Sequence, residues 1–171
     1  SCNPSRLRFD CVNCYLGVGM DSSLDIPTDA TIEVWTRGHS IQDNKYVIAD
    51  FDSFTTKSQG SLGYRTTSSG DHFKFYQSNS NNTASTIDGM TIITTETWYH
   101  LAFVRDDSVK TITLFVNGVQ DGTVSYTGTT VTNFSQVGNR IIGCSSTVDL
   151  ANADVAKAMI YNTALSPSQI S

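Results

Sequence analysis

The sequence predicts an all-β fold of short antiparallel strands. Apolar and polar residues alternate with a period of two in several segments, among them residues 31–37, and this pattern is typical of half-buried strands. Asn117-Gly118 separates two apolar runs and is a strong hairpin signal, because a type I′ turn needs positive φ at both central residues. The only glutamates are Glu33 and Glu96, although glutamate is a favoured helix former. Alternation, turn chemistry and composition therefore all favour an all-β fold.

The expected strands follow one another along the chain with short connections. They are residues 31–37, 45–51, 63–67, 72–77, 90–93, 98–105, 111–116, 119–125, 136–142 and 155–162. Residues 78–86 are polar without periodicity and are expected to be a loop. Residues 166–169 carry a capping-box pattern with proline at the first helical position, so at most one helical turn closes the chain. Many short strands predict a sandwich or barrel, in one domain spanning residues 1–171.

Composition excludes several classes of partner. The net charge is −5 and the 11 basic residues are scattered, whereas nucleic-acid binding needs a basic stripe. No run of 18 apolar residues is present, so we expect no membrane span. The chain begins at Ser1 without a visible leader, and we interpret it as a mature or trimmed chain.

Four cysteines, Cys2, Cys11, Cys14 and Cys144, indicate two disulfides and an oxidising compartment. Three pairings are open, and we favour Cys11–Cys14 with Cys2–Cys144. A zinc site built on the Cys11-x-x-Cys14 spacing and free thiols are the alternatives.

Two N-glycosylation sequons begin at Asn81 and Asn133. They arise easily by chance in a chain rich in Ser, Thr and Asn. With the cysteines they favour a secreted protein, or one on a cell or virion surface.

Five ordered sequence blocks resemble the concanavalin A-like superfamily, in particular its laminin G-like domains with their pentraxin-related architecture. The blocks are residues 23–35, 97–105 (TWYHLAFVR), 114–118 (LFVNG), 142–143 and 159–167 (MIYNTALSP). The resemblance covers roughly residues 7 to 170. It implies a two-sheet antiparallel jelly-roll sandwich that serves carbohydrate or protein recognition outside cells.

The resemblance also raises the question of calcium. Asp43-Asn44 is similar to the Asp-Asn pair that opens the calcium site of pentraxins, and Asp149 is the single carboxylate where a partner cluster should fall. Residues 10–14 and 155–157 depart from the family pattern in ways that remove carboxylates from regions that often help to hold a structural calcium ion. Asp43, Asn44 and Asp149 thus form a sparse ligand set, and an ordinary Asx turn is the alternative.

Candidate sugar contacts combine an aromatic ring with polar neighbours. Trp35 and Arg37 form one group, on the strand face opposite Ile32 and Val34. A second group lies on adjacent hairpin strands and comprises Tyr64, Arg65, Asp71, His72 and Tyr76. The alternative is that these rings are structural, as most aromatic residues are. His100 is expected to be a hydrogen-bonded core histidine, because Ala102 continues its face.

No catalytic constellation is found, and we do not expect an enzyme. The Glu-x-Asp-x-x-Glu motif of related retaining glucanases is absent, and Asp50 and Asp52 are the one carboxylate pair on a shared strand face. No Gly-x-Ser-x-Gly elbow occurs.

The leading hypothesis is a carbohydrate-binding, lectin-like recognition module whose partner is a glycan or glycoprotein. The alternative is a structural subunit of an extracellular filament, appendage or virion surface, assembled through self-association. Recognition of a protein ligand is a third hypothesis. No cofactor is implied apart from the calcium ion discussed above.

Overall fold

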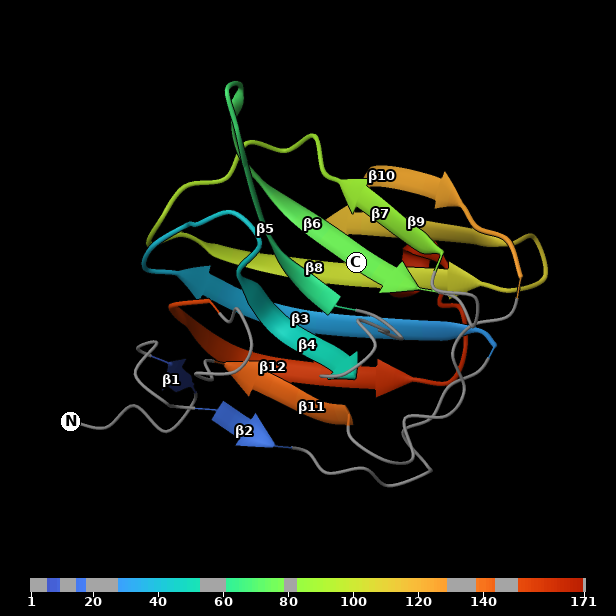
Figure 1. Cartoon of the computed structure of the whole chain (residues 1–171), viewed down its shortest axis with the longest axis horizontal. Helices are drawn as coiled ribbons and strands as arrows, with labels where there is room; N and C mark the ends of the chain where they lie inside the picture. Colours follow the sequence, from blue (N-terminus) through green and yellow to red (C-terminus); the bar gives the residue numbers. More distant parts are fainter. Residues whose placement is uncertain are drawn as a thin grey trace.

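The computed structural model describes residues 6–9, 15–17, 28–52, 61–78, 83–128, 138–143 and 151–170 of the 171-residue chain. These residues form two layers of β-sheet, one in front of the other in Figure 1. Sheet A contains β1 (Leu7–Phe9), β3 (Ala30–Gly38), β8 (Trp98–Asp106), β9 (Thr111–Val116), β10 (Val119–Ser125) and β12 (Ala153–Tyr161). Sheet B contains β2 (Tyr15–Gly17), β4 (Tyr46–Asp52), β5 (Ser61–Thr67), β6 (Gly70–Ser78), β7 (Ala84–Asp88) and β11 (Gly138–Gly143).

Both sheets are antiparallel throughout and share one principle of assembly. The order in sheet A is β1-β12-β3-β8-β9-β10 and in sheet B β2-β11-β4-β5-β6-β7. In each sheet a strand from late in the sequence therefore inserts between two early ones. The predicted all-β, two-sheet antiparallel sandwich is confirmed.

The core lies between the sheets, where large aromatic side chains meet. Phe75 of β6 stacks on Phe103 of β8 with ring centroids 3.7 Å apart, so this pair joins the two sheets. Phe73 of β6 meets Tyr99 of β8 edge to face at 5.2 Å. Each such side chain contributes roughly 1.5–3 kcal/mol by leaving water. The period-two pattern fixed which residues face this core.

A second apolar cluster lies on the outer side of sheet A. Ala102, Val104 and Phe115 are buried there under Ile170, which follows the 3-10 turn η2 (Pro167–Gln169). The predicted capping box is present, with the Ser166 backbone N–H donating to Gln169 Oε1 at 2.9 Å. The C-terminal segment therefore covers part of the sheet that would otherwise face water.

Two strand expectations were wrong, and both errors have a physical reason. Residues 90–93 are not a strand: Asp121 accepts hydrogen bonds from the backbone N–H of Met90 and Thr91, at 3.1 and 2.8 Å, and Met90 is exposed. Residues 78–86 are not all loop, because Ala84 to Asp88 form the edge strand β7 on β6. Ile87 alone is buried in β7, so the apolar alternation was too weak to read.

Within the part of the chain that the structure describes, no helix is long and apolar enough to cross a bilayer. The cysteines, the sequon residues Asn81 and Asn133, and Asp149 all lie outside the described residues. Their predicted roles stay predictions.

Candidate functional site

The sequence-predicted glycan residues fall on opposite outer faces of the sandwich. Trp35 and Arg37 lie on β3 and face outward from sheet A. The second group lies on β5 and β6 of sheet B, where Arg65 pairs in register with His72 and Tyr76 with Ser61. The two groups therefore cannot act in one site, and each surface has to be judged by itself.

We call the charged side chains on the outer face of sheet B the Arg65 surface. It comprises Asp43, Asn44, Arg65, Lys74 and Asp88. The Arg65 guanidinium lies 3.4 Å from Asp43 Oδ2 and 3.6 Å from Asp88 Oδ2, and all three side chains are more than a third exposed. The Lys74 ammonium donates a hydrogen bond to Asn44 Oδ1 at 2.5 Å. Each cation thus already has a partner within the surface.

These contacts bear on the expected calcium ligands. Both Asp43 oxygens accept hydrogen bonds, Oδ1 from the Thr66 backbone N–H at 3.2 Å and Oδ2 from Asn44 Nδ2 at 2.9 Å. Asn44 has positive φ and turns the chain between β3 and β4. Protein N–H donors, some of them neutral and some cationic, therefore already occupy the Asp43 and Asn44 oxygens that calcium would need. Among the described residues no group of three His, Cys, Asp or Glu side chains has metal-binding geometry.

The remaining members of the second group differ in access. Tyr64 is only 1% exposed and packs on Phe73, so its ring cannot contact a surface ligand. His72 is also buried, with Nδ1 3.2 Å from the Thr91 carbonyl oxygen. The expectation of ligand contacts at Tyr64 and His72 is thus wrong, because Tyr64 faces the core between the sheets and His72 is buried against Thr91. Asp71 and Tyr76 stay partly exposed, and Tyr76 packs against the core.

Trp35 lies on the outer face of sheet A with its indole 43% exposed. Its ring stacks on His100 of β8, with centroids 5.1 Å apart and planes 21° apart. On the other side, Trp35 is in register with the exposed Lys157 of β12. In the neighbouring register pair, the Arg37 guanidinium lies 5.4 Å from the Trp98 ring centroid. We call Trp35, Arg37, Trp98, His100 and Lys157 the Trp35 surface.

Buried titratable groups support the Trp35 stack from below. Glu33 is 4% exposed, and its Oε1 lies 3.6 Å from His100 Nε2. Burial lowers the pKa of His100, partly opposed by the Glu33 charge, so burial favours the neutral ring. Burial and the Glu33 carboxylate together raise the pKa of Tyr161. His100 is buried as predicted, but it lies on the outer face of sheet A beneath the exposed Trp35 and not in the core between the sheets.

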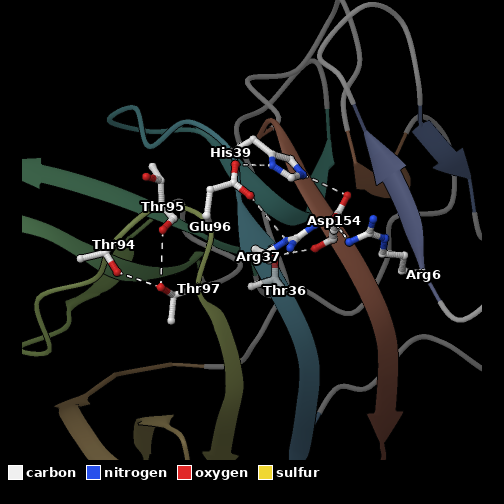
Figure 2. A network of polar contacts seen from close by, with 9 residues as sticks. All are labelled: Arg6, Thr36, Arg37, His39, Thr94, Thr95, Glu96, Thr97 and Asp154. Atoms are coloured by element: carbon white, nitrogen blue, oxygen red, sulfur yellow. Dashed lines mark hydrogen bonds and ion pairs between the residues drawn. The ribbon is translucent and has the colours of Figure 1, made fainter. Parts of the chain in front are cut away.

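A network of charges lies at the end of β3, where β12 and the β7–β8 loop meet (Figure 2). We call it the His39 network: Arg6, Arg37, His39, Glu96 and Asp154. The Asp154 carboxylate is fully buried, and its Oδ2 accepts from Arg6 Nη1 at 2.9 Å and from Arg37 Nη2 at 2.5 Å. His39 lies between two carboxylates, with Nδ1 2.7 Å from Glu96 Oε1 and Nε2 3.0 Å from Asp154 Oδ1.

Sequence reasoning missed most of this network. Arg37 and Asp154 are 117 residues apart in the chain, and His39 and Glu96 are 57 apart. Only the pairing of β12 with β3 brings Asp154 opposite Arg37. The available signal was Glu96 itself, one of two glutamates in a chain of few charges.

The two antiparallel six-stranded sheets define a sandwich of the concanavalin A-like class. The chain belongs to the concanavalin A-like lectin/glucanases superfamily, whose laminin G type family model matches residues 14–171. No curated protein sequence matches the chain. The resemblance found in the sequence is thus confirmed at the level of the family.

Solved structures share this fold at low sequence identity. The CBM40 of the Ruminococcus gnavus IT-sialidase, bound to α2,3-sialyllactose, matches with a TM-score of 0.72 and 12% identity, covering 96% of this chain and 95% of that chain. The heptameric SAP-like pentraxin from Limulus polyphemus has a TM-score of 0.64 and 15% identity, covering 99% and 76%. The NanB sialidase from Streptococcus pneumoniae has a TM-score of 0.73 and 14% identity, covering 96% and 27%. At these identities the likeness establishes the fold alone.

Proposed function

We propose that this chain is a non-catalytic glycan-recognition module of a secreted, cell-surface or virion protein, and that its ligand stacks on the Trp35 surface. The observation that carries the proposal is the half-exposed Trp35 indole, held from behind by His100. An indole face that water reaches can stack on the apolar face of a sugar ring. The exposed Lys157, in register with Trp35 on β12, would supply an ammonium group to bond sugar hydroxyls.

The Arg65 surface is the weaker candidate. Its charges pair with one another, so a ligand would have to break those pairs before binding. The nearby aromatic residue of β6, Tyr76, packs partly against the core. The relative solved with α2,3-sialyllactose supports a glycan as the ligand class.

Binding without hydrolysis is supported by the state of the nearby carboxylates. A glycosidase generally places two carboxyl groups on either side of the scissile bond. Glu33 is buried against His100, and Asp154 is fully buried under Arg37. Glu96 is more exposed but is engaged by His39.

The test is a glycan array and polysaccharide binding assay with and without chelator, followed by titration of the strongest ligand. Trp35→Ala should weaken binding about 30-fold, since truncating an anchor residue costs roughly 2 kcal/mol. Tyr76→Ala is the matched control on the opposite face and should leave affinity within about threefold. Chelator should have no effect, because Asp43 and Asn44 are engaged by protein groups.

Two outcomes would contradict the proposal. Loss of binding in Tyr76→Ala with binding kept in Trp35→Ala would move the site to sheet B. Absence of any glycan binding, together with large assemblies in light scattering, would favour the structural-subunit hypothesis.

A further inference from the structure

Both ring nitrogens of His39 face carboxylate oxygens from different parts of the chain. Nδ1 lies 2.7 Å from Glu96 Oε1, and Nε2 lies 3.0 Å from Asp154 Oδ1. The His39 side chain is only 8% exposed. Nε2 and Asp154 Oδ1 are both shielded from solvent and make no aligned hydrogen bond within the described chain. The approach of His39 Nε2 to Asp154 Oδ1 is thus the one close polar contact that either atom makes within the described residues.

A neutral imidazole cannot satisfy this arrangement. It carries one N–H, and its other nitrogen presents a lone pair, which would face a carboxylate oxygen. The carboxyl groups do not supply the missing proton. The hydrogen bond from His39 is the main cause that lowers the pKa of Glu96. Burial acts to raise the pKa of Asp154, but the close approach of His39 and the hydrogen bond from Arg37 outweigh it and leave that pKa lowered. Both carboxyls therefore remain ionised.

We infer that His39 is a doubly protonated latch that fastens the β7–β8 loop to the end of sheet A, and that loss of its proton releases Glu96 beside the Trp35 surface.

The charges facing His39 come from every described element around it. Asp154 and Glu96 are the anions, while Arg37 of β3 and Arg6 before β1 are the cations in the network. Arg8 of β1 pairs in register with Asp154 and acts electrostatically on Glu96. These arginines reduce the negative charge around His39 but do not take the place of its proton. Among the described residues, no arginine nitrogen bonds Glu96 Oε1.

The rest of the β7–β8 loop is held by other contacts, since the Ile93 backbone N–H donates to the Asp71 carbonyl at 2.8 Å and the Thr94 backbone N–H donates to Tyr99 Oη at 3.0 Å. The latch therefore acts on the turn at Glu96. Glu96 has a left-handed backbone with φ of 60°, which costs energy for a side chain with a Cβ. Its backbone N–H donates to the Gly38 carbonyl at 2.8 Å, and its side chain is 58% exposed. Without the His39 contact, the remaining ion pair to Arg37 Nε spans 3.8 Å. Release of Glu96 thus leaves its side chain with the ion pair to Arg37, while the Thr94 and Thr97 hydroxyls, 3.0 Å apart, still hold the turn itself.

The latch regulates the proposed binding site through Arg37. That side chain lies over Trp98 within the Trp35 surface and contacts both latch carboxylates. Glycan affinity should fall when His39 loses its second proton, because Arg37 then loses the fixed carboxylates that position it. This consequence rests on the proposed function, whereas the latch itself needs no ligand.

The first experiment is nitrogen-15 NMR of the histidine rings in the full chain at roughly pH 5 to 8. At the acidic end of this range, we expect protons on both nitrogens of the His39 ring. Each N–H should show a contact to the carboxylate that it faces, Glu96 or Asp154. A single protonated nitrogen at every pH would overturn the inference.

The second experiment measures the hydrogen-exchange protection of the Glu96 amide over the same range. In the wild type this protection should drop about tenfold as the pH rises, because a charge-assisted hydrogen bond contributes roughly 1.5–3 kcal/mol. In Glu96→Gln the drop should vanish, since a glutamine amide can donate to the lone pair of a neutral His39. Equal drops in both proteins would overturn the latch.

The third experiment repeats the glycan titration with Glu96→Gln across the same pH range. Wild-type affinity should depend on pH and the variant's should not. If no glycan binds at all, the proposed function fails while the two NMR experiments still decide the latch. If glycan binds with the same pH dependence in both proteins, the regulatory role is overturned.

Discussion

The two outer faces of the sandwich carry their charges differently. On sheet A, the Asp154 carboxylate is completely buried and is surrounded by Arg6, Arg37 and His39. On sheet B, the Arg65 guanidinium lies 3.4 Å from Asp43 and 3.6 Å from Asp88, and both carboxylates are open to water. Similar residue types thus form a fixed cluster on one face and loosely held pairs on the other.

The difference teaches how burial determines what a charged residue contributes. Exposed pairs are screened and contribute roughly 0–1 kcal/mol, whereas removing one partner of a buried pair costs roughly 3–5 kcal/mol. The buried cluster can therefore set the position of an aromatic site. The exposed pairs contribute to solubility but do little to fix the positions of neighbouring side chains.

The largest expected effect comes from removing the centre of the buried cluster. Asp154→Ala should lower the free energy of unfolding by about 3–5 kcal/mol, because it leaves buried cations without their anion. Urea denaturation at neutral pH measures this loss. Asp43→Ala on the Arg65 surface is the matched control and should cost less than about 1 kcal/mol. Equal losses would remove the distinction between the faces.

Acid should weaken the fold by a smaller amount. The pKa values of Asp154, Glu96, Asp106 and Asp107 are all lowered in the folded protein. Carboxyls with lowered folded-state pKa contribute stability above their unfolded values, 3.8 for Asp and 4.5 for Glu, and lose it as the pH falls further. Denaturation midpoints should thus decline below about pH 4. A midpoint that stayed flat to about pH 2 would argue against these contacts.

Replacing the ring beneath Trp35 should have a moderate effect. His100→Ala removes the stacked partner and should cost about 1 kcal/mol of stability beyond the lost area, whereas His100→Phe keeps an aromatic ring there. Because the pKa of His100 is lowered, its contribution is present above its unfolded pKa and is lost as the pH falls. Unfolding monitored by tryptophan fluorescence measures this loss of stability. The variant Trp35→Phe shows which part of the emission comes from Trp35.

The smallest expected effect is on sheet B. Asp88→Asn removes a half-exposed carboxylate 3.6 Å from Arg65 and should change stability by less than about 0.5 kcal/mol. Thermal unfolding at low and high salt measures it. A loss above about 2 kcal/mol would show that the Arg65 surface is a fixed site after all.

The strands could be predicted where one face is clearly apolar. Ile32 and Val34 face inward and Trp35 outward, as the alternation of residues 31–37 indicated. The edge strand β7 could not be found, because Ile87 is its one buried side chain. Residues 90–93 were wrongly predicted to form a strand. Their apolar residues suggested one, but Met90 is exposed, and an apolar residue need not lie in a strand.

The candidate site was predicted in part. Trp35 and Arg37 were placed on the correct face, and their exposure could not be known from sequence. Tyr64 and His72 were misplaced, because Tyr64 faces the core between the sheets and His72 is buried against Thr91 of the β7–β8 loop. Alternation distinguishes the two faces of a strand but does not show what lies on top of a face.

The sequence by itself determined the all-β architecture, the faces of its strands and the family. It could do so because alternation, turn residues and ordered motifs are local in the chain. Tertiary structure alone decided that His39, Glu96 and Asp154 meet, and that Trp35 stays open while Glu33 is buried beside it. The physical reason is that contacts across sheets and loops depend on strand register, which joins residues 57 to 148 positions apart.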